Sequence, residues 1–168
     1  MIISVILLVF SFLFEGFISN FISSSLVEFN IFSTLYTLIT FVVIFPYFYN
    51  EKKYYILLIL FSFLIDIVYT NTLILNVILF VAISLLIKFL NFILPDNILM
   101  CNISSFCAVI VYHVLSYLIL TLINYNLYPV SLLFNICLNS VVMTIIYTTF
   151  MYLVSRFLYT KFDMKQIK

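Results

Sequence analysis

The sequence predicts an all-α integral membrane protein with six transmembrane helices, built as a single transmembrane domain over residues 1–168. Composition is the first reason, because 67% of the residues are hydrophobic and only 8% are charged. Soluble domains carry about 25% charged residues, and one small soluble core could not bury so much apolar surface. The second reason is that the apolar segments have the length of bilayer-crossing helices and are separated by short polar breaks.

The polar breaks divide the chain into six apolar segments. About 20 apolar residues cross a bilayer as a helix, and we expect spans near residues 2–22, 31–49, 54–69, 72–94, 99–123 and 129–157. Pro95 and Pro129 fall at helix boundaries, where the missing N–H costs least, and Pro46 falls near the end of the second span. The first segment lacks both a basic region and a small-residue cleavage site, so it predicts a retained span rather than a signal peptide.

The basic residues predict the orientation. With the N-terminus inside, all of them fall on the cytoplasmic side: Lys52, Lys53, Lys88, Arg156, Lys161, Lys165 and Lys168. The predicted outer loops hold none, and Lys and Arg concentrate in cytoplasmic loops of membrane proteins. We therefore expect a multi-pass membrane protein with both termini in the cytoplasm. An odd number of spans would scatter the basic residues over both faces.

Several function classes lack their usual residues. The net charge of +1 gives no electrostatic case for nucleic acid. Cys101, Cys107 and Cys137 have no CxxC spacing and lie in or beside apolar spans, which favours packing over a disulfide or a metal site. No nucleophile sits beside a base, and the single glycine, Gly16, provides no glycine-rich phosphate loop. We expect no catalytic residue, no cofactor and no metal.

Two carboxylates lie inside predicted spans. Asp66 interrupts "FSFLIDIVYTNTLILNV" (61–77), and Glu15 lies at a similar depth in the first span. A charge at the centre of a bilayer costs about 2.5–3.5 kcal/mol on insertion scales, so such acids are rare and usually functional. Three more polar residues fall in the same outer layer of the bilayer: His113, Asn135 and Asn139.

These five residues are the candidate cluster for structure or partner binding. A bare acid in hydrocarbon is too costly, so we expect Glu15 or Asp66 to reach a polar residue on another span by a hydrogen bond, with His113, Asn135 and Asn139 as the leading partners. Ordinary interhelical hydrogen bonds, or an acid that only fixes the fold, are the alternative interpretations. The charges of Glu28 and Asp96 fall in loops, where solvation explains them.

The order of these features resembles the MreD family of rod shape-determining membrane proteins. The stretch "FSFLIDIVYTNTLILNVILF" (61–80) is the most similar, with Asp66 in the place of the family's aspartate and a tight turn after it. Glu15 in "VFSFLFEGF" is similar to the acid that many members carry in the first span. The resemblance covers most of the chain by architecture and about 25 residues by motif.

The resemblance implies a non-enzymatic scaffold of the cell-wall elongation (rod-shape) complex. It implies binding to an MreC-like protein with one membrane span, together with other cell-wall elongation proteins. It also implies a six-helix bundle similar to the substrate-binding subunits of energy-coupling-factor transporters. A substrate-binding subunit of such a transporter is therefore the alternative function, and a proton-relay subunit of a larger complex is a third.

Overall fold

A computed structural model describes residues 2–21, 35–48, 50–70, 72, 74–123 and 129–161, and every regular element in these ranges is helical. The helices are α1 (Ile2–Phe21), α3 (Tyr36–Ile44), α4 (Glu51–Ile65), α5 (Leu75–Ile93), α6 (Ile98–Leu122) and α7 (Val130–Lys161). A 3₁₀ helix, η1 (Phe45–Tyr47), follows α3, and a π-helical turn, η2 (Asp66–Thr70), extends α4. The all-α prediction is confirmed for this part of the chain.

Four of the described helices are long and apolar enough to cross a membrane: α4 with η2, α5, α6 and α7. The two shorter apolar helices are α1, and α3 with η1. The predicted second span, 31–49, contains a helix only from Tyr36 to Tyr47 in the described residues, and residues 31–34 and 49 lie outside them. The chain is thus a helical protein of multi-pass character, and six crossings remain a prediction.

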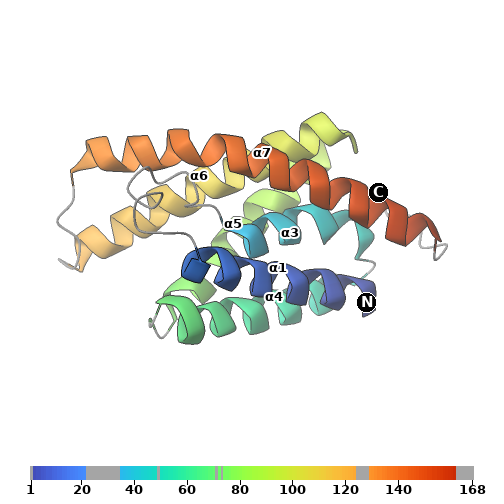
Figure 1. Cartoon of the computed structure of the whole chain (residues 1–168), viewed down its shortest axis with the longest axis horizontal. Helices are drawn as coiled ribbons and strands as arrows, with labels where there is room; N and C mark the ends of the chain where they lie inside the picture. Colours follow the sequence, from blue (N-terminus) through green and yellow to red (C-terminus); the bar gives the residue numbers. More distant parts are fainter. Residues whose placement is uncertain are drawn as a thin grey trace.

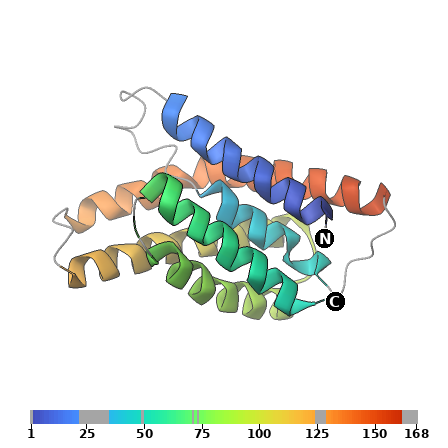
Figure 2. The ribbon, with the colours of Figure 1, turned by 90° about the horizontal axis from the view of Figure 1, so that it is seen from below.

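Helix α3 occupies the middle of the bundle. All nine of its residues are buried, and its neighbours are α1, α6 and α7. Figure 1 shows α6 and α7 along one side and α1 and α4 along the other, and Figure 2 shows α3 behind α1 and α4. Because α3 is enclosed on every side, its ends need hydrogen-bond partners from the protein rather than from water.

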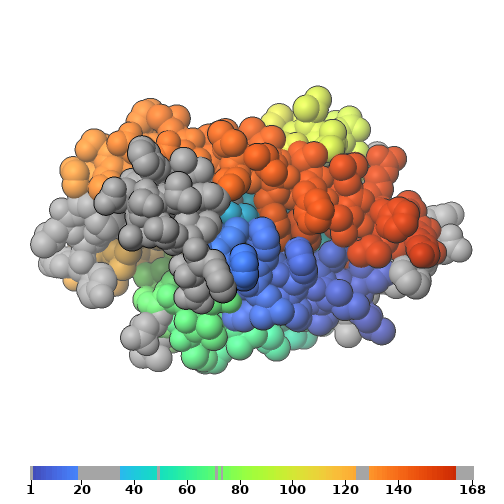
Figure 3. Space-filling model, in the orientation of Figure 1, coloured from blue at the N-terminus to red at the C-terminus, as the bar shows by residue number. Residues whose placement is uncertain are grey.

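The outer faces of the bundle are apolar. Exposed large side chains occur along every long helix, for example Leu13 on α1, Phe63 on α4 and Phe157 on α7. Polar residues, by contrast, are buried between helices, including Ser11 and Thr40. Figure 3 shows α1 beside the C-terminal half of α7 on one face. An apolar outer surface with polar side chains placed between the helices fits a lipid environment.

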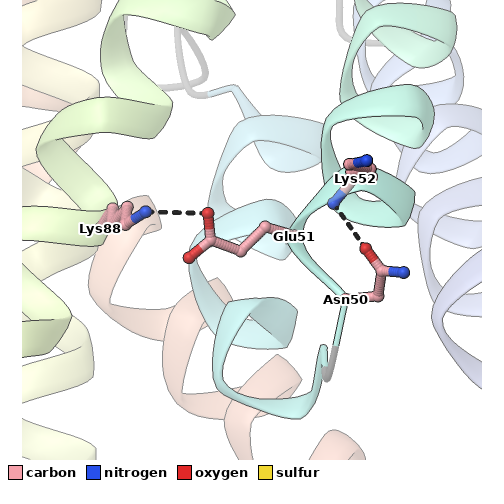
Figure 4. Close-up of polar contacts among 4 residues, drawn as sticks. All are labelled: Asn50, Glu51, Lys52 and Lys88. Atoms are coloured by element: carbon pink, nitrogen blue, oxygen red, sulfur yellow. Dashed lines mark hydrogen bonds and ion pairs between the residues drawn. The ribbon is translucent and has the colours of Figure 1, made fainter.

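The α4–α5 hairpin is joined at the ends far from its turn. Lys88 Nζ on α5 lies 2.8 Å from Glu51 Oε2 on α4, and both side chains are about half exposed (Figure 4). Asn50 caps α4, because its side-chain oxygen accepts a hydrogen bond of 2.9 Å from the backbone N–H of Lys52. This end of the hairpin lies with the start of α1 and the end of α7, at the same end of the bundle (Figure 1).

Candidate functional site

The Asp66 carboxylate caps the first turn of α5. Its Oδ1 accepts the backbone N–H of Asn76 at 3.1 Å, and its Oδ2 accepts the backbone N–H of Val77 at 3.3 Å. The residue at the N-cap position itself is Ile74, whose side chain has no atom that could accept hydrogen bonds from these N–H groups. Asp66 is fully buried and therefore supplies in trans what a Ser, Thr, Asp or Asn cap supplies locally. The negative charge also faces the positive end of the α5 dipole.

The turn between α4 and α5 closes over the same carboxylate. The hydroxyls of Thr70 and Thr72 both donate to Asp66 Oδ1, and the backbone N–H of Thr72 donates to the Asp66 carbonyl at 3.2 Å. The Asn76 side-chain amide adds a bond of 3.0 Å to Asp66 Oδ1. The Asp66 side chain thus links the two helices of the α4–α5 hairpin at its turn. Asn71, in the same turn, lies outside the described residues.

The Asp66 network reaches a third helix through Asn76. The hydroxyl of Tyr112 on α6 donates to Asn76 Oδ1 at 2.5 Å. Asn76 is fully buried, and Tyr112 is buried as well. Helices α4, α5 and α6 are therefore linked by one chain of hydrogen bonds in which each member has a partner, which is the condition for a buried polar group to stabilise a fold.

Glu15 does for α3 what Asp66 does for α5. Its Oε2 accepts the backbone N–H of Thr37 at 3.1 Å and the Thr37 hydroxyl at 2.6 Å. The N-cap residue of α3 is Leu35, which makes no side-chain cap. Thr37 is in the first turn, so the carboxylate again satisfies a donor that the helix cannot satisfy by itself. Both acids in the spans are helix caps supplied by a neighbouring helix.

Tyr69 connects the two capping sites. Its hydroxyl donates to the Phe12 carbonyl on α1 at 2.7 Å, and the two rings are 4.9 Å apart. Its ring lies on Gly16, where a Cβ atom would meet two ring carbons at 3.0 Å. This close contact explains the single glycine of the chain, which is the residue next to Glu15. The π-helical turn η2 carries both Asp66 and Tyr69 and so joins the α5 cap to α1.

Among the described residues, both acids accept hydrogen bonds from another helix, and the donors differ from the leading partners named from the sequence. The hydrogen bonds that Glu15 and Asp66 accept come from Thr37 and from the turn and first residues of α5. His113, Asn135 and Asn139 are not their partners: His113 and Asn139 are half-buried on α6 and α7, and Asn135 is exposed on α7. The sequence predicted a similar depth in the membrane for these residues. Depth along a helix does not determine which of its faces points into the bundle.

Sequence reasoning also missed a group of hydroxyls that we call the hydroxyl seam: Ser4, Ser11, Thr40, Tyr147 and Tyr159. It joins α1, α3 and α7 through bonds of 2.5 Å between Ser11 and Thr40, 2.9 Å from Tyr147 to Ser11, and 2.7 Å between Ser4 and Tyr159. The available signal was the spacing of seven between Ser4 and Ser11, which places both on one face of α1.

The chemistry of these sites is that of hydrogen bonding between helices. Each carboxylate is surrounded by N–H and O–H donors of the protein itself. Among the described residues, no three His, Cys, Asp or Glu side chains gather as a metal-binding group. The arrangement is suited to hold helix ends in place. Comparison with protein-family models, with curated proteins and with solved structures gives no match.

Proposed function

We propose that this protein is a non-enzymatic membrane scaffold of the MreD type, which works in the cell-wall elongation complex of a bacterial cell membrane. One observation carries the proposal: both acids inside the helices are engaged by donors of their own chain. A proton relay or a catalytic acid needs a carboxylate that exchanges its partner during the reaction. A scaffold needs a carboxylate that keeps its partners and so holds the helices in a fixed arrangement.

The shape that Asp66 fixes is the turn end of the α4–α5 hairpin. Side chains around this turn point outward and are apolar, including Ile67, Val68, Ile74 and Ile78. On α1, Leu13 and Phe17 are exposed near the contact with Tyr69. These faces of α1, α4 and α5 are the proposed binding surface, and an apolar membrane helix of an MreC-like partner is the occupant that the resemblance implies.

The proposed topology has six spans with both termini in the cytoplasm. The starting end of α1 and the final end of α7 lie together in the bundle (Figure 1), which supports an even number of crossings. The described basic residues lie toward this end as well, in the first turn of α4 and the last turns of α5 and α7. Their concentration at one end supports the cytoplasmic assignment.

A substrate-binding transporter subunit fits the geometry less well. Such a subunit would take its substrate near the outer ends of the helices. In the described part of the chain, a hollow lies at the α5–α6 connection, which belongs to the opposite end. Among the described residues, the Asp66 network and Tyr69 lie at the other end, where they bind helices to one another.

The proposal is tested by purifying the tagged full-length protein from its native membrane after cross-linking and identifying the proteins that accompany it. We expect a partner with one membrane span and a large domain outside the cytoplasm. Ile78→Asn on the proposed surface should reduce its capture, whereas Ile146→Asn on α7 should not. The two positions form a matched pair, because their side chains are 58% and 59% exposed.

Equal capture by both variants would place the binding surface elsewhere. Recovery of transporter ATPase subunits in place of such a partner would contradict the scaffold function.

A further inference from the structure

An amide side chain faces outward from α7 among apolar residues. Asn135 is exposed, and within the described residues its side chain makes no hydrogen bond. The other helical asparagines whose side chains are described are buried or half-buried: Asn76, Asn91, Asn102 and Asn139. In the described part of the chain, Asn135 is thus the helical amide that the bundle leaves exposed and unpaired.

Asn135 lies near one edge of the hydrocarbon layer. At 1.5 Å per residue it is roughly 30 Å along α7 from Arg156, the first charged residue of that helix. The hydrocarbon core is about 30 Å thick, and transmembrane helices tilt by about 20° on average. With Arg156 at one membrane surface, the amide reaches the opposite edge of the hydrocarbon between the apolar residues Phe134 and Leu138. An amide in such surroundings needs a hydrogen-bond partner from outside the bundle.

The exposed residues that follow Asn135 have the spacing of a helix–helix interface. Asn135, Leu138, Val142 and Ile145 are three, four and three residues apart, and all four are exposed. We call these four residues the Asn135 stripe. This alternation keeps one side of a helix against a second helix in a left-handed pair. The buried Thr144 lies on the opposite face of α7, and Figure 1 shows this half of α7 (orange) along the edge of the bundle.

A second copy of the same chain is the occupant that fits this stripe. The Asn amide has both donors and an acceptor, so two Asn135 side chains can satisfy each other across a two-fold axis. Two copies in one membrane have the same topology, and their α7 helices therefore run parallel with Asn135 at equal depth. A different protein would need its own polar residue at that depth.

The sequence of α7 also suits a parallel pair. Residues 130–155 carry no charge that would repel a second copy. The apolar residues of the stripe are Leu, Val and Ile, which pack well between two helices. In parallel helix pairs, a single Asn at an interface position sets the register and the number of helices.

We infer that two copies of this protein associate through the Asn135 stripe, with the two Asn135 amides hydrogen-bonded to each other. Leu138, Val142 and Ile145 of one copy then pack against the same residues of the other. The interface is on a different helix from the faces of α1, α4 and α5 proposed for the partner, and it does not depend on that proposal.

Association is measured by energy transfer between full-length copies that carry donor or acceptor fluorophores at the C-terminus. The protein is reconstituted in liposomes at a series of protein-to-lipid ratios, and the wild type should follow a monomer–dimer equilibrium. Asn135→Val should weaken association by about tenfold, the scale of one interhelical amide pair in synthetic membrane-spanning peptides. Asn135→Gln keeps a self-complementary amide and should lose less.

Asn97→Val is the matched control. Asn97 is also an exposed asparagine whose side chain makes no cap hydrogen bond, and it lies at the start of α6, away from the stripe. This variant should associate like the wild type. Asn135→Val should unfold at the wild-type midpoint, because the Asn135 side chain makes no hydrogen bond within the described residues. Its loss of association is then not a loss of folding.

Cysteine cross-linking locates the interface. Ile145→Cys and Phe150→Cys are compared in a background without Cys101, Cys107 and Cys137, after oxidation in liposomes. The two positions are 45% and 50% exposed, but only Ile145 belongs to the stripe. Ile145→Cys should give a disulfide-linked dimer, and Phe150→Cys should not.

A wild type that stays monomeric at every density would mean that lipid headgroups or water satisfy the Asn135 amide, and would overturn the inference. Equal association of Asn135→Val and the wild type would overturn it as well, and so would cross-linking of Phe150→Cys in place of Ile145→Cys, because the interface would then lie elsewhere. Weakened association of Asn97→Val to the same degree would make the effect unspecific and would also contradict it.

Discussion

Asp66 and Asn76 are joined by two hydrogen bonds across the α4–α5 turn, one from the backbone N–H and one from the side-chain amide of Asn76. The first bond caps α5, and the second orients Asn76 so that its oxygen accepts from Tyr112 on α6. A carboxylate is suited to this position because it accepts several donors at once. The carboxylate inside an apolar helix is thus explained by the helix end that it faces.

Two substitutions of Asp66 distinguish the stability that its hydrogen-bond acceptors provide from the stability that its charge provides. Asp66→Asn keeps one acceptor oxygen for Asn76 and should lower the free energy of unfolding by about 1 kcal/mol or less, since Asn and Asp cap helices about equally. Asp66→Leu leaves buried N–H groups unsatisfied and should lower the free energy of unfolding by about 1–3 kcal/mol. Unfolding of the full-length protein in detergent micelles, followed by circular dichroism, measures both, with Glu51→Gln as the exposed control. Equal loss in the two Asp66 variants would show that the charge itself is required.

Glu15 and Thr37 should be energetically coupled. Glu15→Leu and Thr37→Val each remove part of the α3 cap, in which Thr37 donates through its N–H and its hydroxyl. Because the hydroxyl bond is lost in either variant, the double variant should cost less than the sum, with a coupling energy of about 0.5–3 kcal/mol. A double-mutant cycle on unfolding in micelles gives this energy. Additive losses would mean that the hydroxyl bond contributes nothing.

Gly16→Ala should be destabilising because of Tyr69. The added methyl group would meet the Tyr69 ring, which is held in place by its bond to the Phe12 carbonyl. Overpacking of this kind costs about 1–3 kcal/mol. In a Tyr69→Phe background the nearest atom and the restraining bond are both gone, so Gly16→Ala should cost clearly less. Comparing the two unfolding midpoints checks this, and an equal loss in both backgrounds would exclude Tyr69 as the cause.

The topology predicts which loops reach the outside. A single cysteine introduced in the 124–129 loop, in a background without Cys101, Cys107 and Cys137, should react with a membrane-impermeant maleimide in whole cells. A cysteine introduced at Leu94, in the α5–α6 connection, should react only after the membrane is opened. The opposite pattern would reverse the predicted orientation. Reaction of both sites in intact cells would mean that α6, which lies between them, does not cross the membrane.

The sequence predicted the helices well because apolar length is a direct consequence of bilayer thickness. It placed α5, α6 and α7 close to their observed ranges and identified the two acids inside helices, Glu15 and Asp66. It did not reveal that α3 is short, because residues 31–49 are mostly apolar and carry no charged residue that would mark the start of the helix. It also missed Thr37 and Asn76 as partners. The sequence signal that could have been used is the absence of a capping side chain at Leu35 and Ile74. A helix that begins at such a residue needs a hydrogen-bond acceptor from another part of the chain.

The most direct test of the capping account is hydrogen–deuterium exchange of the full-length protein with each acid replaced in turn. The account predicts that Asp66→Leu speeds exchange of the amides of Asn76 and Val77 by about tenfold or more and leaves that of Thr37 unchanged. Glu15→Leu should do the reverse. If exchange at both helix starts responds equally to either substitution, or to neither, the two carboxylates are not the caps of α5 and α3.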